Sequence, residues 1–251
     1  WSVENPEDFW KSIWDFTNVK GELGDILLEK SSIFFKNKFF PDSKLNYAQN
    51  LLKKNNDELA IIFKSENGFR TSITWKKLNS DVENISNWMR SKGVKKGDRV
   101  AAYLPNIPET VTAFISTSVL ASIWSSCSPD FGISGVIDRF SQINPKILFI
   151  GENYFYNGKK INILERLPEI IKKIPSIKKV IIVPYPGSQK SKKKKYKIDT
   201  YFWEELINKK KRNRNKIKYE MSSFNDPLAI LYSSGTTGKP KCICHGTGGV
   251  L

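Results

Sequence analysis

From about residue 58 onward, short apolar runs alternate with longer stretches in which apolar residues recur every three or four positions. The first pattern is typical of buried strands, and the second of helices that pack on one face. The predicted strands are 59–63, 69–73, 99–104, 123–127, 146–150, 179–183 and 228–232. The predicted helices are one capped by Thr74 and ended by Gly93, then 108–120, 134–143 and 161–174. This alternation indicates an α/β fold with a largely parallel sheet flanked by helices.

A lead-in of different character precedes the alternation. The run Asn5-Pro6-Glu7-Asp8 combines a capping side chain, a proline and two acidic residues, so a helix is predicted to begin there. Four aromatic side chains are expected to anchor the lead-in by burial: Phe34, Phe35, Phe39 and Phe40. We therefore divide the chain into a helical N-terminal segment, 1–57, and an α/β region, 58–251.

The positive charge of the chain is concentrated in one segment. The 251 residues carry 41 Lys+Arg against 25 Asp+Glu, a formal net charge of +16. Nucleic-acid-binding proteins usually combine arginine with aromatic stacking platforms, whereas the basic residues of 190–218 are mostly lysine. The aromatic residues of this segment are better explained as the buried face of one short element: Tyr196, Tyr201, Phe202 and Trp203. We expect no nucleic-acid partner.

Neither a membrane span nor a metal site is predicted. The uncharged stretch 110–129 is long enough to cross a bilayer, but it is rich in Ser and Thr. Three cysteines, an odd number, argue against a disulfide scaffold and for a reducing compartment. We therefore expect a cytoplasmic protein without a membrane partner. The spacing of Cys242, Cys244 and His245 is that of an alternating strand rather than of a tetrahedral zinc site.

The segment after the last predicted strand is rich in groups that bind phosphate. They are Ser233, Ser234, Gly235, Thr236, Thr237, Gly238, Lys239 and Lys241. The glycines let the backbone present its N–H groups, the hydroxyls donate to phosphate oxygens, and the lysines balance negative charge. Two residues between the glycines, and a proline after Lys239, exclude a Walker A loop. We predict a triphosphate-binding loop over 233–241, the glycine-rich loop, at the strand end where α/β sheets bind ligands.

The glycine-rich loop resembles that of the acyl-adenylate-forming superfamily. Further motifs are similar to those of the short-chain acyl-CoA synthetases. They are WSVE at 1–4 with the aromatic residues of 9–16, LNYA at 45–48, GDRV at 97–100 and LPNIPE at 104–109. Two more, IWSSCSPDFG at 123–132 and DRFSQI at 138–143, look specifically like the acetoacetyl-CoA synthetases. The resemblance implies the N-terminal portion of the large domain of such an enzyme, so that 58–251 is a partial AMP-binding (adenylation) domain.

The resemblance implies a ligase reaction in two steps. Acetoacetate attacks the α-phosphorus of ATP and releases pyrophosphate, and the thiol of coenzyme A then displaces AMP from acetoacetyl-adenylate. The implied cofactors and co-substrates are ATP, Mg²⁺ and coenzyme A, and the implied partners are small molecules. Two alternatives stay open: an acetyl- or propionyl-type short-chain acyl-CoA synthetase, and a catalytically incompetent module that binds nucleotide or a partner.

The resemblance also assigns the site residues. The glycine-rich loop would bind the β- and γ-phosphates of ATP, and Lys159 would meet the phosphates of coenzyme A. Tyr156 stands where acetyl-CoA synthetases tend to have arginine, which weakens the coenzyme A assignment. In this family the adenine-, ribose- and acid-activating residues follow the glycine-rich loop, so the catalytic residues are expected beyond Leu251. We therefore expect an N-terminal fragment that is inactive alone.

Overall fold

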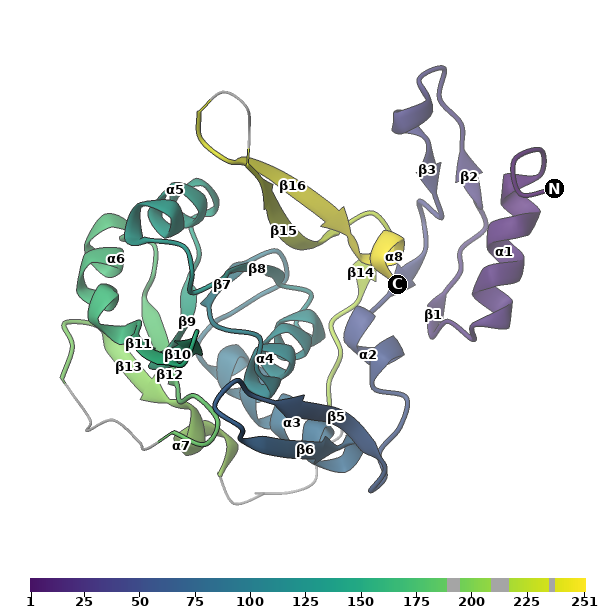
Figure 1. Ribbon diagram of the computed structural model, residues 1–251. Coiled ribbons are helices and arrows are strands. Elements are labelled where there is room, and N and C mark those ends of the chain that lie inside the picture. Colours follow the sequence, from purple (N-terminus) through teal and green to yellow (C-terminus); the bar gives the residue numbers. More distant parts are fainter. Residues whose placement is uncertain (189–194, 209–216, 235–237) are drawn as a thin grey trace.

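The computed structural model describes residues 1–188, 195–208, 217–234 and 238–251, and its centre is a seven-stranded sheet (Figure 1). The strands in spatial order are β13 (Asp199–Phe202), β12 (Lys179–Val183), β9 (Ile147–Gly151), β7 (Arg99–Tyr103), β8 (Ile123–Cys127), β15 (Pro227–Ser233) and β16 (Lys241–Gly246). All neighbours are parallel except β15 and β16, which form an antiparallel hairpin. The predicted α/β fold with a largely parallel sheet is confirmed.

Helices cover both faces of this sheet (Figure 1). One face carries α3 (Trp75–Ser91), α4 (Pro108–Val119) and α7 (Trp203–Ile207), and the other carries α5 (Ile133–Ile143) and α6 (Leu167–Lys173). Helix α3 begins as predicted, because the Thr74 hydroxyl accepts a hydrogen bond from the Lys77 backbone N–H (3.2 Å). It also ends as predicted, since Gly93 adopts the left-handed conformation (φ 82°) that favours glycine.

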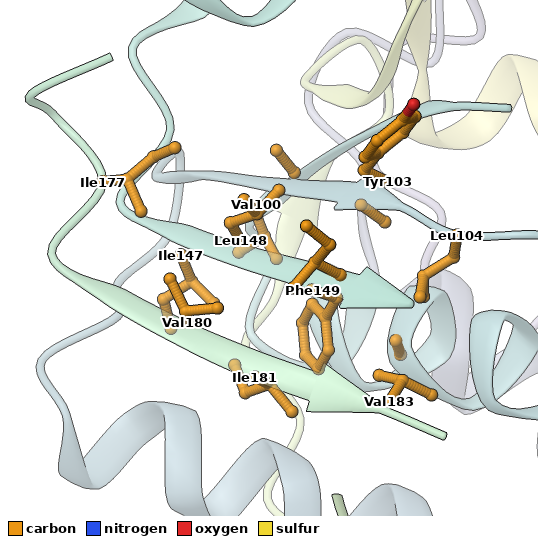
Figure 2. Close-up of a cluster of buried hydrophobic side chains, with 14 of the residues drawn as sticks. Val100, Tyr103, Leu104, Ile147, Leu148, Phe149, Ile177, Val180, Ile181 and Val183 are labelled. Atoms are coloured by element: carbon orange, nitrogen blue, oxygen red, sulfur yellow. The ribbon is translucent and has the colours of Figure 1, made fainter. Parts of the chain in front are cut away.

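The core lies between the central strands and the helices. Every residue of β9 is buried, and so are the last four residues of both β7 and β12. Figure 2 shows Leu148, Phe149 and Ile181 among these side chains. Burial on both faces explains why these strands are continuous apolar runs rather than alternating ones. The sequence prediction placed them to within a residue or two for the same reason.

Short elements connect the lead-in to the end of the described chain. Helix α1 (Pro6–Phe16), α2 (Tyr47–Leu51), β1 (Gly21–Glu22) and β4 (Lys44–Leu45) lie beside β14 (Ser222–Ser223) and α8 (Thr247–Val250) (Figure 1). Strand β4 pairs with β1 and with β14. The ring of Phe40 lies between those of Trp14 (5.4 Å between centroids) and Phe224 (5.0 Å). The lead-in is thus held by residues far along the chain, and the boundary at residue 57 stays a prediction.

Two of the four predicted aromatic anchors are wrong. Phe34 and Phe35 belong to a single 3₁₀ turn, η1 (Phe34–Lys36), and are 88% and 82% exposed. That turn connects β2 (Leu28–Glu29) and β3 (Lys38–Phe39), whose hairpin projects away from the core (Figure 1). Phe40 is buried and Phe39 is half-buried. The lead-in also contains four short strands besides its helices, which the apolar pattern did not indicate.

The single helix predicted over 161–174 is also wrong. The structure has a hairpin of β10 (Asn153–Tyr156) and β11 (Lys159–Asn162), a 3₁₀ turn (Leu164–Arg166) and only then α6. Asn157 and Gly158 both have positive φ (50° and 71°), the signature of a tight hairpin turn that takes precedence over helical periodicity. A comparable hairpin, β5 (Leu59–Lys64) and β6 (Arg70–Thr74), lies where it was predicted. The aromatic residues of 196–203 do not share one element either, since Tyr201 and Phe202 belong to β13, Trp203 begins α7, and Tyr196 precedes both.

A buried carboxyl group lies at the start of α4. Burial, together with the nearby Asp81 and Glu204 carboxylates, raises the pKa of Glu109 to about 7, against the pull of Lys77. The Glu109 Oε2 atom is buried and has no hydrogen-bond partner within the described part of the chain. Asp81 is itself buried and is paired with Lys77 at 2.6 Å. Glu109 is therefore best accommodated in its neutral form.

This carboxyl group should make the protein less stable as the pH rises. The folded pKa lies above the unfolded one, so the folded state binds more protons than the unfolded state between pH 4.5 and about 7. Urea unfolding should show a free energy that falls by on the order of 1–3 kcal/mol over this window. The Glu109→Gln variant should lose this component and be the more stable protein at pH 8. An exposed control, Glu220→Gln, should keep the wild-type slope; equal slopes in all three proteins would refute the assignment.

Candidate phosphate-binding site

The glycine-rich loop connects the two strands of the β15–β16 hairpin. Ser233 and Lys241 are opposite each other in the register, so they form the two ends of the loop. Because β15 is parallel to β8 with Ala229 beside Trp124, Ser233 is level with Ser128, the first residue after β8. The loop therefore lies at the carboxyl edge of the parallel strands, as predicted from the sequence.

The described part of the loop offers polar groups to solvent. Ser233 is half-buried, and Ser234, Lys239 and Lys241 are exposed. Gly238 has a positive φ of 112°, and a Cβ atom added there would meet no other atom within 4 Å. Glycine is therefore favoured at this position by the backbone conformation and not by lack of space. The predicted residues Gly235, Thr236 and Thr237 lie outside the described residues. Two hydroxyls and two ammonium groups at one sheet edge can bind a polyanion.

A second turn lies beside the start of the loop and is held rigidly. Arg166 donates to the backbone carbonyls of Pro129 (3.1 Å) and Phe131 (3.0 Å) and to the Tyr103 hydroxyl. The buried Tyr103 hydroxyl in turn donates to the Phe131 carbonyl (2.6 Å). Burial raises the pKa of Tyr103, which keeps this hydroxyl protonated and able to donate. The 128–132 turn thus forms a fixed wall next to Ser233.

Lys159 does not join the glycine-rich loop. It lies on β11, opposite Tyr156, and its side chain is exposed. The β10–β11 hairpin is a separate two-stranded sheet and not part of the seven-stranded sheet that carries the loop. A ligand that contacts both would have to extend from one sheet to the other. The assignment of Lys159 to coenzyme A therefore stays a prediction.

The cysteines are placed as the strand interpretation predicted. Cys242 and Cys244 alternate along β16, and Cys127 ends β8. Burial raises the pKa of Cys127 to about 12, so its thiol is protonated at neutral pH and is a poor nucleophile. Among the residues that the structure describes, no three His, Cys, Asp or Glu side chains converge as metal ligands. Over the same residues, no helix combines the length and the apolar character needed to cross a bilayer.

Sequence reasoning missed the side chains that support the loop from behind. The sequence pointed to Arg139 and Gln142 only as members of the DRFSQI motif at 138–143 and indicated no contact with the loop for either of them. In the structure, Arg139 and Gln142 lie one turn apart on α5; Arg139 contacts Tyr232, just before the loop, and Gln142 contacts Pro240, near the end of the loop. Their spacing of three residues on a predicted helix was the one available signal, because such residues share a face.

The fold and the position of this loop define a class of protein, and the chain belongs to the AMP-binding enzyme family, whose family model matches residues 48–251. It is 42% identical over 256 residues to the acetoacetyl-CoA synthetase of Gallus gallus, and 37% identical over 251 residues to the acetoacetyl-coenzyme A synthetase of Rhizobium meliloti (strain 1021). Both alignments cover 100% of this chain and 38% of the relative.

A solved structure gives the same result. The acetoacetyl-CoA synthetase from Streptomyces lividans superposes with a TM-score of 0.89 at 34% sequence identity, covering 100% of this chain and 38% of that one. The resemblance to the N-terminal part of the acetoacetyl-CoA synthetases is thereby confirmed. The chain spans 38% of the length of these relatives.

Proposed function

We propose that this chain is the ATP-phosphate-binding portion of an AMP-forming acid–CoA ligase that activates acetoacetate. The observation that carries the proposal is the glycine-rich loop at the carboxyl edge of a sheet that matches acetoacetyl-CoA synthetases over its whole length. In the proposed reaction, the carboxylate of acetoacetate attacks the α-phosphorus of ATP and pyrophosphate leaves. The thiol of coenzyme A then attacks the acyl carbon, loses its proton and displaces AMP.

The residues of this chain would contribute electrostatics and positioning rather than covalent catalysis. Lys239 and Lys241 would balance the charge of the β- and γ-phosphates, and Ser233 and Ser234 would donate to their oxygens, together with Gly235, Thr236, Thr237 and Gly238. Mg²⁺ would enter as the counter-ion of the triphosphate. Lys159 is proposed as a contact for the phosphates of coenzyme A, on the strength of its exposure and charge alone.

The proposal includes small molecules as the only partners, without nucleic acid or membrane. We also propose a cytoplasmic location, which the odd number of cysteines supports: all three are free thiols, and Cys242 and Cys244 are exposed.

The deciding experiment measures ATP–pyrophosphate exchange by the protein that contains this chain, with acetoacetate, acetate, propionate or butyrate as the acid. Acetoacetate should give the highest kcat/KM, and a reaction without acid sets the background. Preference for acetate or propionate would replace the proposal with the other short-chain synthetases. ATP binding without exchange for any acid would leave only a nucleotide-binding module.

A further inference from the structure

Helix α5 packs behind the glycine-rich loop and reaches both of its ends. Arg139 contacts Tyr232, the residue before Ser233, and Gln142 contacts Pro240, the residue before Lys241. Residues three apart on a helix project from the same face, so one surface of α5 serves both contacts. No side chain of the proposed phosphate site itself belongs to α5.

At the start of the loop, Arg139 lies between two aromatic rings. Its guanidinium carbon is 4.0 Å from the centroid of Phe131 and 5.7 Å from that of Tyr232. A hydrogen bond from Arg139 to the Gly135 carbonyl (2.8 Å) fixes the guanidinium in this position. The Tyr232 hydroxyl donates to the Arg139 carbonyl (3.3 Å), so side chain and backbone of Arg139 both hold this tyrosine. Arg139 thus connects the rigid 128–132 turn to the last residues of β15.

The partner of the Tyr232 hydroxyl on the sheet side is Ser125. Its Oγ donates to the Tyr232 hydroxyl oxygen (3.0 Å) and also lies 2.9 Å from the Ile230 carbonyl oxygen. Burial raises the pKa of Tyr232, so the hydroxyl stays protonated and can donate to Arg139. The start of the loop is therefore fixed from α5 and from β8 together.

At the end of the loop, the side chain of Gln142 hydrogen-bonds to the backbone of Pro240. Pro240 has no N–H and cannot extend the β15–β16 ladder beyond Lys241. Its carbonyl instead accepts a hydrogen bond from the Gln142 side-chain amide (2.9 Å), which also donates to the Asp138 carbonyl (2.8 Å). The Cys242 thiol donates to the Oε1 atom of the same amide (3.7 Å). Gln142 therefore holds the residues on both sides of Lys241.

We propose that Arg139 and Gln142 are positioning residues for the triphosphate of ATP: they hold Tyr232 and Pro240, so that the adjacent binding groups of Ser233 and Lys241 are preorganised. This inference rests on the proposed function of the loop. Binding groups that are held in place before the ligand arrives lose less conformational entropy on binding, so loosening either contact should lower the affinity.

The first test is the affinity of the protein that contains this chain for MgATP and for inorganic tripolyphosphate, by titration calorimetry. Gln142→Met keeps the side-chain length and removes its hydrogen bonds, and Arg139→Lys keeps the charge and removes the planar group that stacks. Each variant should bind both ligands about three- to tenfold more weakly, the equivalent of one lost hydrogen bond. The control, Ser141→Ala, removes an exposed hydroxyl from the same helix and should bind like wild type.

Unchanged affinity of Gln142→Met would overturn the inference for the end of the loop. Wild-type affinity of Arg139→Lys would show that only the positive charge of Arg139 matters. It would overturn the inference for the start of the loop. Melting temperatures of all variants separate loosening of the loop from loss of the fold.

The second test uses the thiols of β16 and needs no nucleotide. Loss of the Gln142 acceptor should favour the Cys242 thiolate and speed its alkylation by iodoacetamide about three- to tenfold relative to Cys244, an internal standard on the same strand. An unchanged ratio of rates in Gln142→Met would show that Gln142 does not hold the end of the loop.

The proposed function of the loop and the positioning role of Arg139 and Gln142 are refuted by different results. If the wild-type protein that contains this chain binds neither MgATP nor tripolyphosphate, the proposed function is refuted, while the alkylation ratio still decides whether Gln142 holds the loop end. If wild type binds and neither affinity nor alkylation ratio responds, the positioning role alone is refuted.

Discussion

Replacing Lys241 by alanine should lower acid-dependent ATP–pyrophosphate exchange by about tenfold to a hundredfold. A hydrogen bond to a charged group contributes about 1.5–3 kcal/mol, and removal of one donor that faces developing negative charge has an effect of this size or more. Lys241 is the first residue of β16 and stands opposite Ser233, so its ammonium group lies where the two ends of the loop meet. The measurement is kcat and KM for MgATP in the exchange assay, in the protein that contains this chain.

The matched control removes the same charge elsewhere. Lys64 is exposed at the end of β5, in a hairpin on the opposite side of the molecule from the β15–β16 turn (Figure 1). Lys64→Ala should leave both constants unchanged. Equal losses in the two variants would attribute the effect to the overall charge of the protein, and wild-type exchange by Lys241→Ala would show that this lysine does not handle the triphosphate.

The position of the loop could be predicted from the sequence, but its support could not. Closely spaced glycines, hydroxyl side chains and lysines indicate what a loop could bind, and the apolar strand before them indicates where the loop lies. The bond from Gln142 to the Pro240 carbonyl joins residues 98 positions apart. Helical periodicity tells which residues share a face and not which distant segment that face meets, so this contact needed the structure.

The error over 161–174, by contrast, has a local cause. Ile161, Leu164, Leu167 and Ile170 recur at helical spacing, yet the first of them belongs to strand β11. The turn residues Asn157 and Gly158 adopt positive φ and form a tight hairpin turn. This turn places Ile161 in a strand although its spacing fits a helix. By contrast, β9 was found almost exactly in place because a strand buried on both faces tolerates no polar residue within it.

Truncation of a central core side chain should have the largest effect on stability. Phe149 is fully buried on β9 (Figure 2). Its ring centroid lies 6.4 Å from that of Trp124 on β8 and 6.3 Å from that of Trp203 on α7. Phe149→Ala should lower the free energy of unfolding by about 3–5 kcal/mol, through lost burial and the cavity that remains. This is a large part of the 5–15 kcal/mol typical of a folded protein, so partial unfolding at 37 °C is expected.

The contrasting variant is Phe34→Ala, which removes the same ring from a residue that is 88% exposed. Its effect on the urea-unfolding free energy should lie within about 0.5 kcal/mol of zero. The pair separates the two interpretations of the aromatic residues in the lead-in. A loss of several kcal/mol in Phe34→Ala would restore Phe34 as an anchor, as its apolar character alone suggested. A small loss in Phe149→Ala would instead contradict the packing of the central sheet, in which that ring is fully buried.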